Sequence, residues 1–165
     1  MGKRYAAAVD DEGPPRSLLA LPSFAMGRIS ARGRRGVVER LRDEGLLLRH
    51  YAALAALEQF APCAQRTLAA RLGWDPADLV GILDGLEQRG LIRRRRDPAD
   101  RRRQLVELSD VGAGAVARCH RLAAEAQEEM LAPLTGAQRQ TLAGLLAQLV
   151  ESPSDAPRIN EAERT

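Results

Sequence analysis

The sequence is poor in the residues that support disulfide frameworks and membrane spans. Two cysteines in 165 residues are too few for a disulfide-stapled protein, which favours a reducing compartment. Hydrophobic residues make up 45% of the chain, yet no apolar run approaches the roughly 20 residues that cross a bilayer. The first residues also lack a targeting segment. We therefore expect a cytoplasmic protein with no membrane partner.

Aromatic residues and lysine are also scarce. Only 3% of the residues are aromatic, so the core must consist of Leu, Val, Ile and Ala, which suits packed helices. Lys3 is the only lysine, so arginine is the base used throughout the chain. A chain of 165 residues, 28% of them charged, is ordinary for one folded domain with a sizeable core.

Positive charge is concentrated in one short segment. Residues 93–103 contain seven arginines and two aspartates, a net charge of +5 in a chain whose total is +3. So many like charges repel one another unless a polyanion is bound, and focused basic charge is typical of a nucleic-acid-binding element. These arginines are Arg93, Arg94, Arg95, Arg96, Arg101, Arg102 and Arg103.

Periodic apolar residues predict two N-terminal helices. Residues 1–16 and 152–165 are polar and are predicted to form a flexible arm and a polar tail. Between them, the first helix is expected from about Pro22 to Glu44, before Gly45, and the second from about Leu48 to Phe60.

The next segment predicts a helix-turn-helix. A helix over residues 64–72 ends at Gly73, and Asp75 followed by Pro76 is a typical helix start. The helix that follows ends at Gly90. Its apolar residues lie at i, i+3, i+4 and i+7 and form one buried stripe: Leu79, Ile82, Leu83 and Leu86. Two helices joined by a short turn that contains glycine form this motif.

A basic hairpin and two further helices complete the pattern. Strands are expected over residues 91–95 and 104–108, joined by a turn that proline and aspartate stiffen. Ser109 caps a helix that runs to about Leu131. Thr135 with Gln138 forms a capping box for a last helix, which ends near Val150.

The hairpin and the helices before it resemble one family. Residues 91–94, 97–103 and 106–109, with Gly112, resemble the wing signature of the MarR family of transcription regulators. Two segments that precede the hairpin, Leu68–Gly73 and Leu83–Leu91, are similar to the helix-turn-helix of that family. The resemblance covers roughly residues 17–150, and its joint spacing is a specific signal.

The resemblance implies a fold and an assembly. The fold is mainly α with a small β-hairpin wing, a winged helix-turn-helix whose N- and C-terminal helices form a dimerisation frame. N-terminal helices would occupy residues 17–60, the DNA-binding domain residues 61–109, and the C-terminal dimerisation helices residues 110–151. The implied function is that of a homodimeric regulator, usually a repressor, that binds a pseudo-palindromic double-stranded DNA. A small anionic or phenolic effector often relieves that binding.

The wing arginines are the first candidate DNA contacts. Arginines on a stiff hairpin can lie along phosphates or enter the narrow minor groove. We expect this of all seven arginines in residues 93–103. From the resemblance, Asp97 is expected to pair with Arg101 or Arg102 across the turn, and Asp100 to help stabilise the wing.

The helix-turn-helix supplies the other candidate contacts. Ala77 or Val80 can touch a thymine methyl group, and Asp78 can accept a hydrogen bond from a cytosine amine. Many relatives carry Ser, Thr and Arg on this helix, so strong base readout by arginine is not expected here. Gly81 and Gly85 either let the helix backbone approach DNA closely or are tolerated defects that cost about 1 kcal/mol each. Four residues of the preceding helix are candidates for phosphate contact: Gln65, Arg66, Thr67 and Arg71. For Arg66 the alternative is a solvated surface position without a DNA contact.

The last helix carries an apolar stripe. Its residues are Leu142, Leu145, Leu146, Leu149 and Val150. The stripe is wide enough to bury against a second copy of the chain, or else against the chain itself.

Two alternatives remain open. A metal- or thiol-responsive sensor on the same fold would use His50, His120, Cys63 and Cys119, although adjacent residues on a helix make a poor chelate and both cysteines suit the core. A DNA-binding module without an effector site would explain the unusual recognition helix. We expect no enzyme, no metal and no cofactor, because the sequence has no catalytic triad, paired carboxylates or phosphate-cradling glycine loop.

Overall fold

Helices form most of the structure, a computed structural model that describes residues 13–100 and 103–151. In chain order the elements are α1 (Arg16–Leu19), α2 (Pro22–Asp43), α3 (Leu48–Phe60), β1 (Cys63–Ala64), α4 (Gln65–Leu72), α5 (Pro76–Gln88), β2 (Ile92–Arg96), β3 (Gln104–Leu108), α6 (Asp110–Met130) and α7 (Gly136–Glu151). The predicted helices and both predicted strands are confirmed to within about two residues. The four-residue α1 and the two-residue β1 were not predicted.

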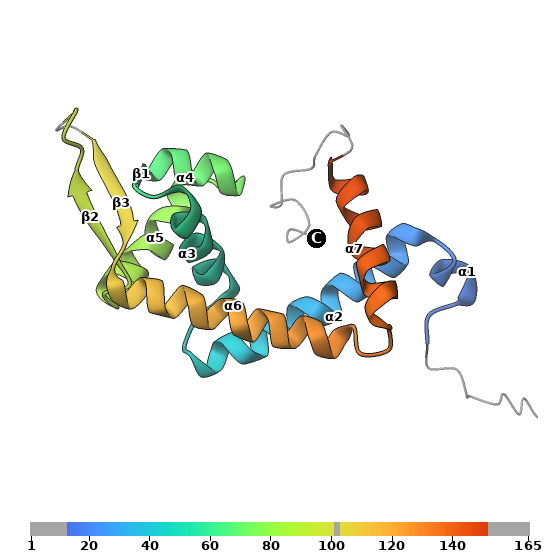
Figure 1. Cartoon of the computed structure of the whole chain (residues 1–165). Helices are drawn as coiled ribbons and strands as arrows, with labels where there is room; N and C mark the ends of the chain where they lie inside the picture. The colour runs from blue at the N-terminus through green and yellow to red at the C-terminus, as the bar shows by residue number, and fades with distance from the viewer. Residues whose placement is uncertain (1–12, 101–102, 152–165) are drawn as a thin grey trace, which may run out of the picture.

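The molecule has two parts joined by the long helix α6. At one end α3, α4 and α5 pack beside the sheet, and the β2–β3 hairpin projects from them (Figure 1). At the other end α2 lies along α6, and α7 rises from the chain near α1 (Figure 1). None of the described helices is long and apolar enough to cross a membrane.

Leucines from the helix-turn-helix form the centre of the core. Leu79, Leu83 and Leu86 of α5 are fully buried, as the stripe predicted, and they join Leu68 of α4 and Leu54 of α3. Burying such a side chain stabilises the fold by about 1.5–3 kcal/mol. This shared core fixes how α5 sits relative to α4.

The sheet has three antiparallel strands in the order β1-β3-β2. β1 pairs with β3 through Cys63 and Val106, and β2 pairs with β3 from Ile92 opposite Leu108 to Arg96 opposite Gln104. The short β1 therefore ties the start of α4 to the base of the hairpin.

The predicted helix ends are confirmed by their hydrogen bonds. The Asp75 carboxylate accepts from Ala77 N at 2.7 Å, and Thr135 and Gln138 exchange the two bonds of a capping box. Gly73 ends α4 with a φ of 66°, a left-handed conformation that favours glycine.

A second set of bonds connects α5 to the end of α2. Arg89, at the C-terminus of α5, donates from its two Nη atoms to the carbonyl oxygens of Gly45 at 2.7 Å and Glu44 at 3.1 Å. The Glu44 carboxylate in turn accepts from Arg118 of α6 at 3.2 Å. The helix-turn-helix is thus bonded to the turn that follows α2, and that turn is bonded to α6.

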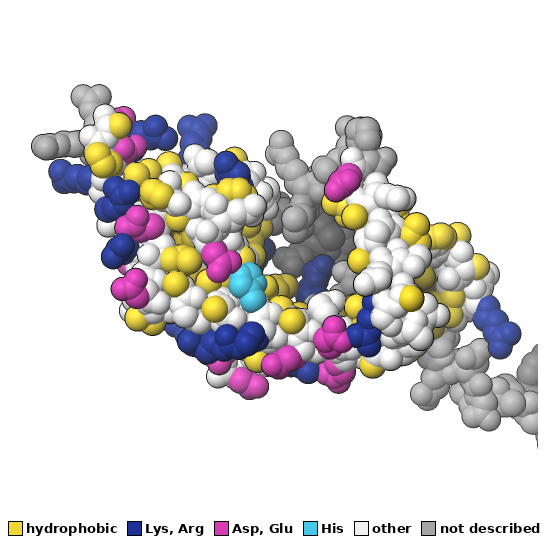
Figure 2. Space-filling model, in the orientation of Figure 1, with side chains coloured by type: hydrophobic (Ala, Val, Ile, Leu, Met, Phe, Trp, Pro, Cys, Tyr) yellow, Lys and Arg dark blue, Asp and Glu magenta, His cyan; other side chains and the backbone are white. Residues whose placement is uncertain are grey.

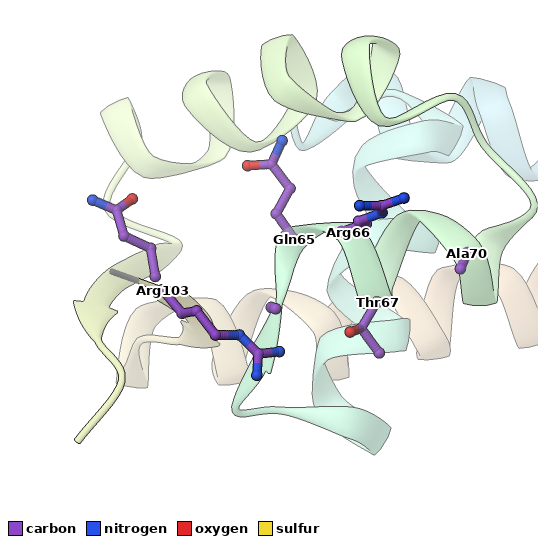
Figure 3. A pocket seen from close by; sticks show the side chains of 7 residues that line it. Gln65, Arg66, Thr67, Ala70 and Arg103 are labelled. Carbon is purple, nitrogen blue, oxygen red and sulfur yellow. The ribbon is translucent and has the colours of Figure 1, made fainter. Parts of the chain in front are cut away.

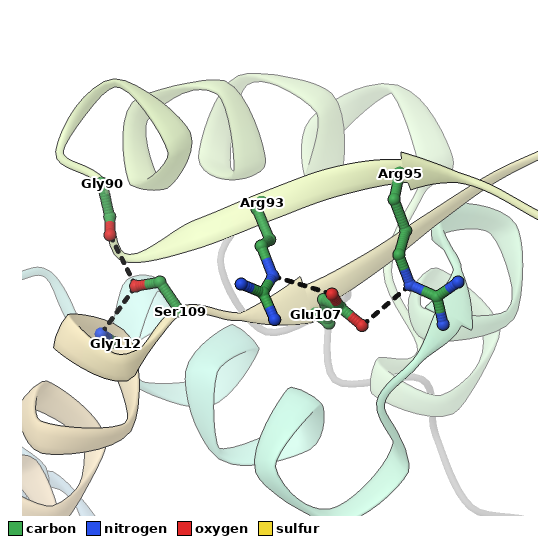
Figure 4. Close-up of polar contacts among 6 residues, drawn as sticks. All are labelled: Gly90, Arg93, Arg95, Glu107, Ser109 and Gly112. Carbon is green, nitrogen blue, oxygen red and sulfur yellow. Dashed lines mark hydrogen bonds and ion pairs between the residues drawn. The ribbon is translucent and has the colours of Figure 1, made fainter.

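The closest backbone approach lies where the hairpin meets α6. Ser109 Oγ donates to Gly90 O at 2.6 Å and accepts from Gly112 N at 2.9 Å, as Figure 4 shows. A Cβ at position 112 would lie 1.8 Å from Leu91 O. Only glycine fits here, which explains the glycine that follows the predicted capping serine.

Gly112→Ala should therefore destabilise the protein by about 3 kcal/mol, because the methyl group forces α6 away from the hairpin. Gly114→Ala is the matched control, since the nearest atom to its Cβ is a flexible Arg118 Nη1 at 3.7 Å. This control should gain up to about 1 kcal/mol through reduced chain entropy. Urea unfolding of both variants tests the contrast, and equal midpoints would contradict it.

Candidate nucleic-acid interface

One face of α5 remains open to solvent. Ala77, Asp78, Val80 and Gly81 are exposed on it, opposite the buried leucines. A Cβ built at Gly81 or at Gly85 meets no atom within 4 Å. The helix therefore presents a shallow, small-residue face that another molecule can approach closely.

A hollow of about 770 Å³ lies between α4 and the start of β3, toward the tip of the hairpin. It is lined by Ala64, Gln65, Arg66, Thr67, Ala70, Arg103 and Gln104. In Figure 3 the Arg103 side chain reaches from the hairpin toward the start of α4, where Gln65, Arg66 and Thr67 lie. No side chain caps that helix start, so its free N–H groups and two arginines make the hollow attractive to an anion.

Arg93 and Arg95 share one carboxylate on the outer face of the hairpin. Glu107 accepts from Arg93 Nε at 2.8 Å and from Arg95 Nε at 3.0 Å, as drawn in Figure 4. Hydrogen bonds from Arg95 and then Arg93 lower the pKa of the Glu107 carboxyl. One negative charge thus partly neutralises two of the predicted DNA contacts.

Arg94 points to the opposite face of the hairpin, toward α5. Its Nη2 lies 2.6 Å from Asp84 Oδ1, its Nη1 is bonded to Glu87 Oε2, and its side chain is only 18% exposed. Desolvation lowers the pKa of Arg94, but the bonds to Asp84 and Glu87 outweigh it and the net change is upward. The sequence did not predict Asp84 and Glu87 as partners of the wing.

The tip of the wing carries the remaining basic residues. Arg96 and Arg103 are exposed and form no ion pair with any described residue. Arg101 and Arg102, with their predicted pairing to Asp97, lie outside the described residues. Among the described residues, the Asp97 carboxylate accepts from Ala99 N at 2.9 Å, and Asp97 N donates to Arg103 O at 2.9 Å.

Asp100 and Arg71 have other surroundings. The Asp100 carbonyl accepts from Arg103 N at 2.9 Å, so its backbone helps to close the turn. The Arg71 guanidinium stacks 3.9 Å from the Phe60 ring centroid, and this contact anchors the arginine against α3. Arg66, by contrast, is exposed at the hollow.

Comparison with known proteins agrees with this arrangement. The model of the MarR family matches residues 44–103. A transcriptional regulatory protein for the hcr operon of Thauera aromatica is 32% identical over 114 residues, which are 69% of this chain and 69% of the relative. The chain belongs to the MarR family.

Solved structures of MarR-type proteins share the fold. The repressor CouR, bound to a 23-mer DNA duplex, is 30% identical with a TM-score of 0.73 over 85% of this chain and 99% of CouR. BpsR of Bordetella bronchiseptica, whose DNA binding is regulated by 6-hydroxynicotinic acid, has a TM-score of 0.69 at 24% identity, over 85% of this chain and 99% of BpsR. The mainly helical fold with a winged helix-turn-helix is therefore confirmed, and the family consists of transcription regulators rather than enzymes.

The apolar stripe of α7 is not covered by the described part of this MarR-family chain. α7 has no buried residue, and Leu145 and Leu149 are 54% and 62% exposed. Leu146 and Val150 are exposed as well, and Leu142 is half-buried. In Figure 2 apolar side chains lie along α7 and the neighbouring part of the molecule. No described segment of the chain buries this stripe, and its burial against a second copy or within the chain stays a prediction.

The proposed thiol and metal residues have other surroundings in the structure than a shared site. Cys63 and Cys119 are both buried, and desolvation raises the pKa of each thiol. His50 Nδ1 accepts from Leu47 N at 3.2 Å, whereas His120 lies between Tyr51 at 2.9 Å and Glu58 at 2.7 Å. Among the described residues no three His, Cys, Asp or Glu side chains are grouped to hold a metal. Protonated, buried thiols are poor nucleophiles, which weighs against the thiol-sensor alternative.

The sequence did not predict the acidic partners of the wing arginines, which are Asp84, Glu87 and Glu107. Only Glu107 lies on the hairpin itself, within a predicted strand. In an antiparallel hairpin the directly opposed residues share a face, and Glu107 is opposite Arg93. The predicted strands contain both residues, but the register that places them opposite each other was not predicted. The contact of Arg94 with Asp84 and Glu87 joins two different elements and has no comparable local signal.

The lowered pKa of Glu107 gives a pH prediction. A carboxyl group whose pKa is depressed on folding stabilises the fold above its unfolded pKa of about 4.3, and this contribution is lost as the pH falls through the folded value. Acidification from about pH 5 to pH 3 should therefore loosen the β2–β3 hairpin. The Glu107 carboxyl shift and hairpin amide exchange by NMR measure it. Glu107→Gln should lack this component, and titration of Glu107 at its ordinary pKa would refute the assignment.

Proposed function

We propose that this MarR-family chain is a homodimeric repressor that binds a pseudo-palindromic double-stranded DNA. The observation that carries the proposal is the hollow between α4 and the wing, where Arg66 and Arg103 come together from separate elements. The positive charge of its two arginines suits the phosphate backbone of DNA. CouR, which has the same fold, is bound to a DNA duplex in its own structure.

Each element has a role in the proposed complex. The open face of α5 enters the major groove, where Ala77 or Val80 touches a thymine methyl group and Asp78 accepts from a cytosine amine. Gly81 lets the helix backbone come close to the base edges. The N-terminus of α4, with Gln65, Thr67 and Arg66, holds a phosphate and sets the register.

The wing supplies the salt-dependent part of the affinity. Arg96 and Arg103, with Arg101 and Arg102, reach the phosphates or the minor groove beside the α5 site. Arg93 and Arg95 contribute less, because each shares the Glu107 carboxylate. This division predicts that the tip, rather than the base of the wing, carries most of the attraction for the DNA backbone.

The dimer is proposed from the exposed apolar surface at the other end of the molecule. Leu145, Leu146, Leu149 and Val150 of α7 lie at the same end as Leu21 and Ile29, and all six are at least 40% exposed. Large apolar side chains exposed in such number favour an interface. A two-fold dimer would place two wings and two α5 helices about one turn of DNA, roughly 34–36 Å, apart.

We also propose that a small anionic or phenolic effector relieves DNA binding. Support comes from BpsR, whose DNA binding is regulated by 6-hydroxynicotinic acid. No residue of this chain is assigned to the effector.

Selection of bound sequences from a random duplex pool, at a fixed stated salt concentration, tests the proposed function. We expect an enriched palindrome whose half-sites are centred about 10 base pairs apart. Binding without any enriched sequence would favour a module without regulatory specificity, and the absence of duplex binding would refute the proposal.

A triple substitution tests the role of the wing tip. Arg101→Ala, Arg102→Ala and Arg103→Ala together should leave the fold intact, weaken duplex binding by at least about 100-fold and reduce the salt slope by about 5, because the dimer loses six arginines. The control removes three arginines elsewhere: Arg35→Ala, Arg42→Ala and Arg121→Ala. Fluorescence anisotropy across a salt series measures both proteins. The wing assignment is wrong if the two triple variants behave alike.

A charge placed on α7 tests the dimer. Leu145→Glu with Leu149→Glu should give monomers, because burying two carboxylates in an apolar interface costs several kcal/mol. Val111→Glu is the control, since Val111 is 62% exposed but lies at the start of α6 near the hairpin. Sedimentation equilibrium gives the mass of each variant. A dimer that survives both α7 substitutions would place the interface elsewhere.

A further inference from the structure

We propose that Arg94 is a positioning residue that locks the wing to the recognition helix α5, and that it is not a phosphate ligand. This inference rests on the proposed function, because it concerns how the two DNA-contacting elements are held together. It separates Arg94 from the other six arginines of residues 93–103, with which the sequence groups it.

The strand register directs Arg94 inward. Arg94 lies opposite Val106, which is 1% exposed, whereas Arg93 lies opposite Glu107 on the solvent side. Because successive side chains of a strand alternate between faces, Arg94 shares its face with the core and its two neighbours do not. Phosphate on the outer face of the wing meets Arg93 and Arg95 first.

Both ends of the Arg94 guanidinium are occupied. Nη2 donates to Asp84 Oδ1 at 2.6 Å and Nη1 donates to Glu87 Oε2. The two acids are three residues apart on α5 and therefore lie on one face of that helix. A planar guanidinium can bridge them, which a single ammonium group cannot do with the same geometry.

The group of three side chains carries a net charge of −1. An arginine already surrounded by two carboxylates offers little attraction to a third anion. Removing it would leave Asp84 and Glu87, which are 48% and 39% exposed, as unpaired charges on a helix that approaches DNA. Arg94 thus both fixes the angle of the wing and suppresses a repulsion between α5 and the phosphates.

The experiment compares Arg94→Gln with Arg96→Gln. Arg96 is two residues further on the same strand and the same face, but it is exposed and forms no ion pair with any described residue. Each substitution is made alone and together with Asp84→Asn and Glu87→Gln, which remove the two acids. Arg94→Lys is added to test the bridging geometry.

The first readout needs no DNA. In the free protein, Arg94→Gln should raise amide hydrogen exchange in β2, β3 and the C-terminal half of α5 by at least about tenfold, and Arg96→Gln should not. Arg94→Lys should lie between the wild type and Arg94→Gln. Unchanged exchange in Arg94→Gln would overturn the proposal, whether or not the protein binds DNA.

The second readout is the salt dependence of duplex binding. Arg94→Gln alone should bind about tenfold more weakly, and the added Asp84→Asn and Glu87→Gln should restore the affinity and the wild-type salt slope. Arg96→Gln should lower the slope by about two, one for each subunit of the dimer, with no recovery of the slope when the acids are removed. A slope that falls by about two in the neutral Arg94 triple variant would show a phosphate contact and overturn the proposal. If the wild type binds no duplex, the proposed function fails while amide exchange still decides the role of Arg94.

Discussion

The antiparallel register of β2 and β3 is the constraint on which the character of the wing depends. Four consecutive arginines, Arg93 to Arg96, would be equivalent on a flexible segment. Pairing with β3 sends Arg93 and Arg95 to the side of Glu107 and Arg94 to the side of α5. The register is held in turn by buried Ile92 and Val106, because a slip of one residue would expose both.

That register divides the described arginines of the wing into those paired with carboxylates and those exposed to solvent. At the base, three arginines are matched by three acids that come from outside residues 93–103: Asp84, Glu87 and Glu107. Further along, Arg96 and Arg103 are exposed without such partners among the described residues. The base of the hairpin is thus a structural element in which charge gives rigidity, and charge available for a polyanion lies toward the tip.

A leucine core and two arginines join the helix-turn-helix to the rest of the molecule. α5 shares a leucine core with α3 and α4. Arg89, at its C-terminus, is bonded to the turn after α2, and Asp84 of α5 is bonded to Arg94 of β2. Arg89 thus connects the C-terminus of α5 to the two carbonyl groups that follow α2. In a MarR-family regulator such a connection links the surface proposed for dimerisation with the surface proposed for DNA.

Most of the fold was determined by local sequence patterns. The helices of residues 22–151 follow from apolar periodicity and from caps such as Asp75 and Ser109, whose bonds are formed within three residues. The family follows from the spacing of the same short motifs. β1 and α1 were not predicted, because elements of two and four residues are too short to show a periodic pattern of apolar residues.

The roles of individual arginines were decided only by the tertiary structure. Sequence treats Arg93 to Arg96 as one basic run, since net charge does not reveal which acid lies nearby. Asp84 and Glu87 approach Arg94 only because the α5 core and the hairpin register bring a helix face against a strand face. Likewise, the sequence did not reveal that the described part of the chain leaves the α7 stripe exposed. Helices, caps and turns arise from neighbours in sequence, whereas charge pairing and exposure depend on distant segments that the folded core brings together.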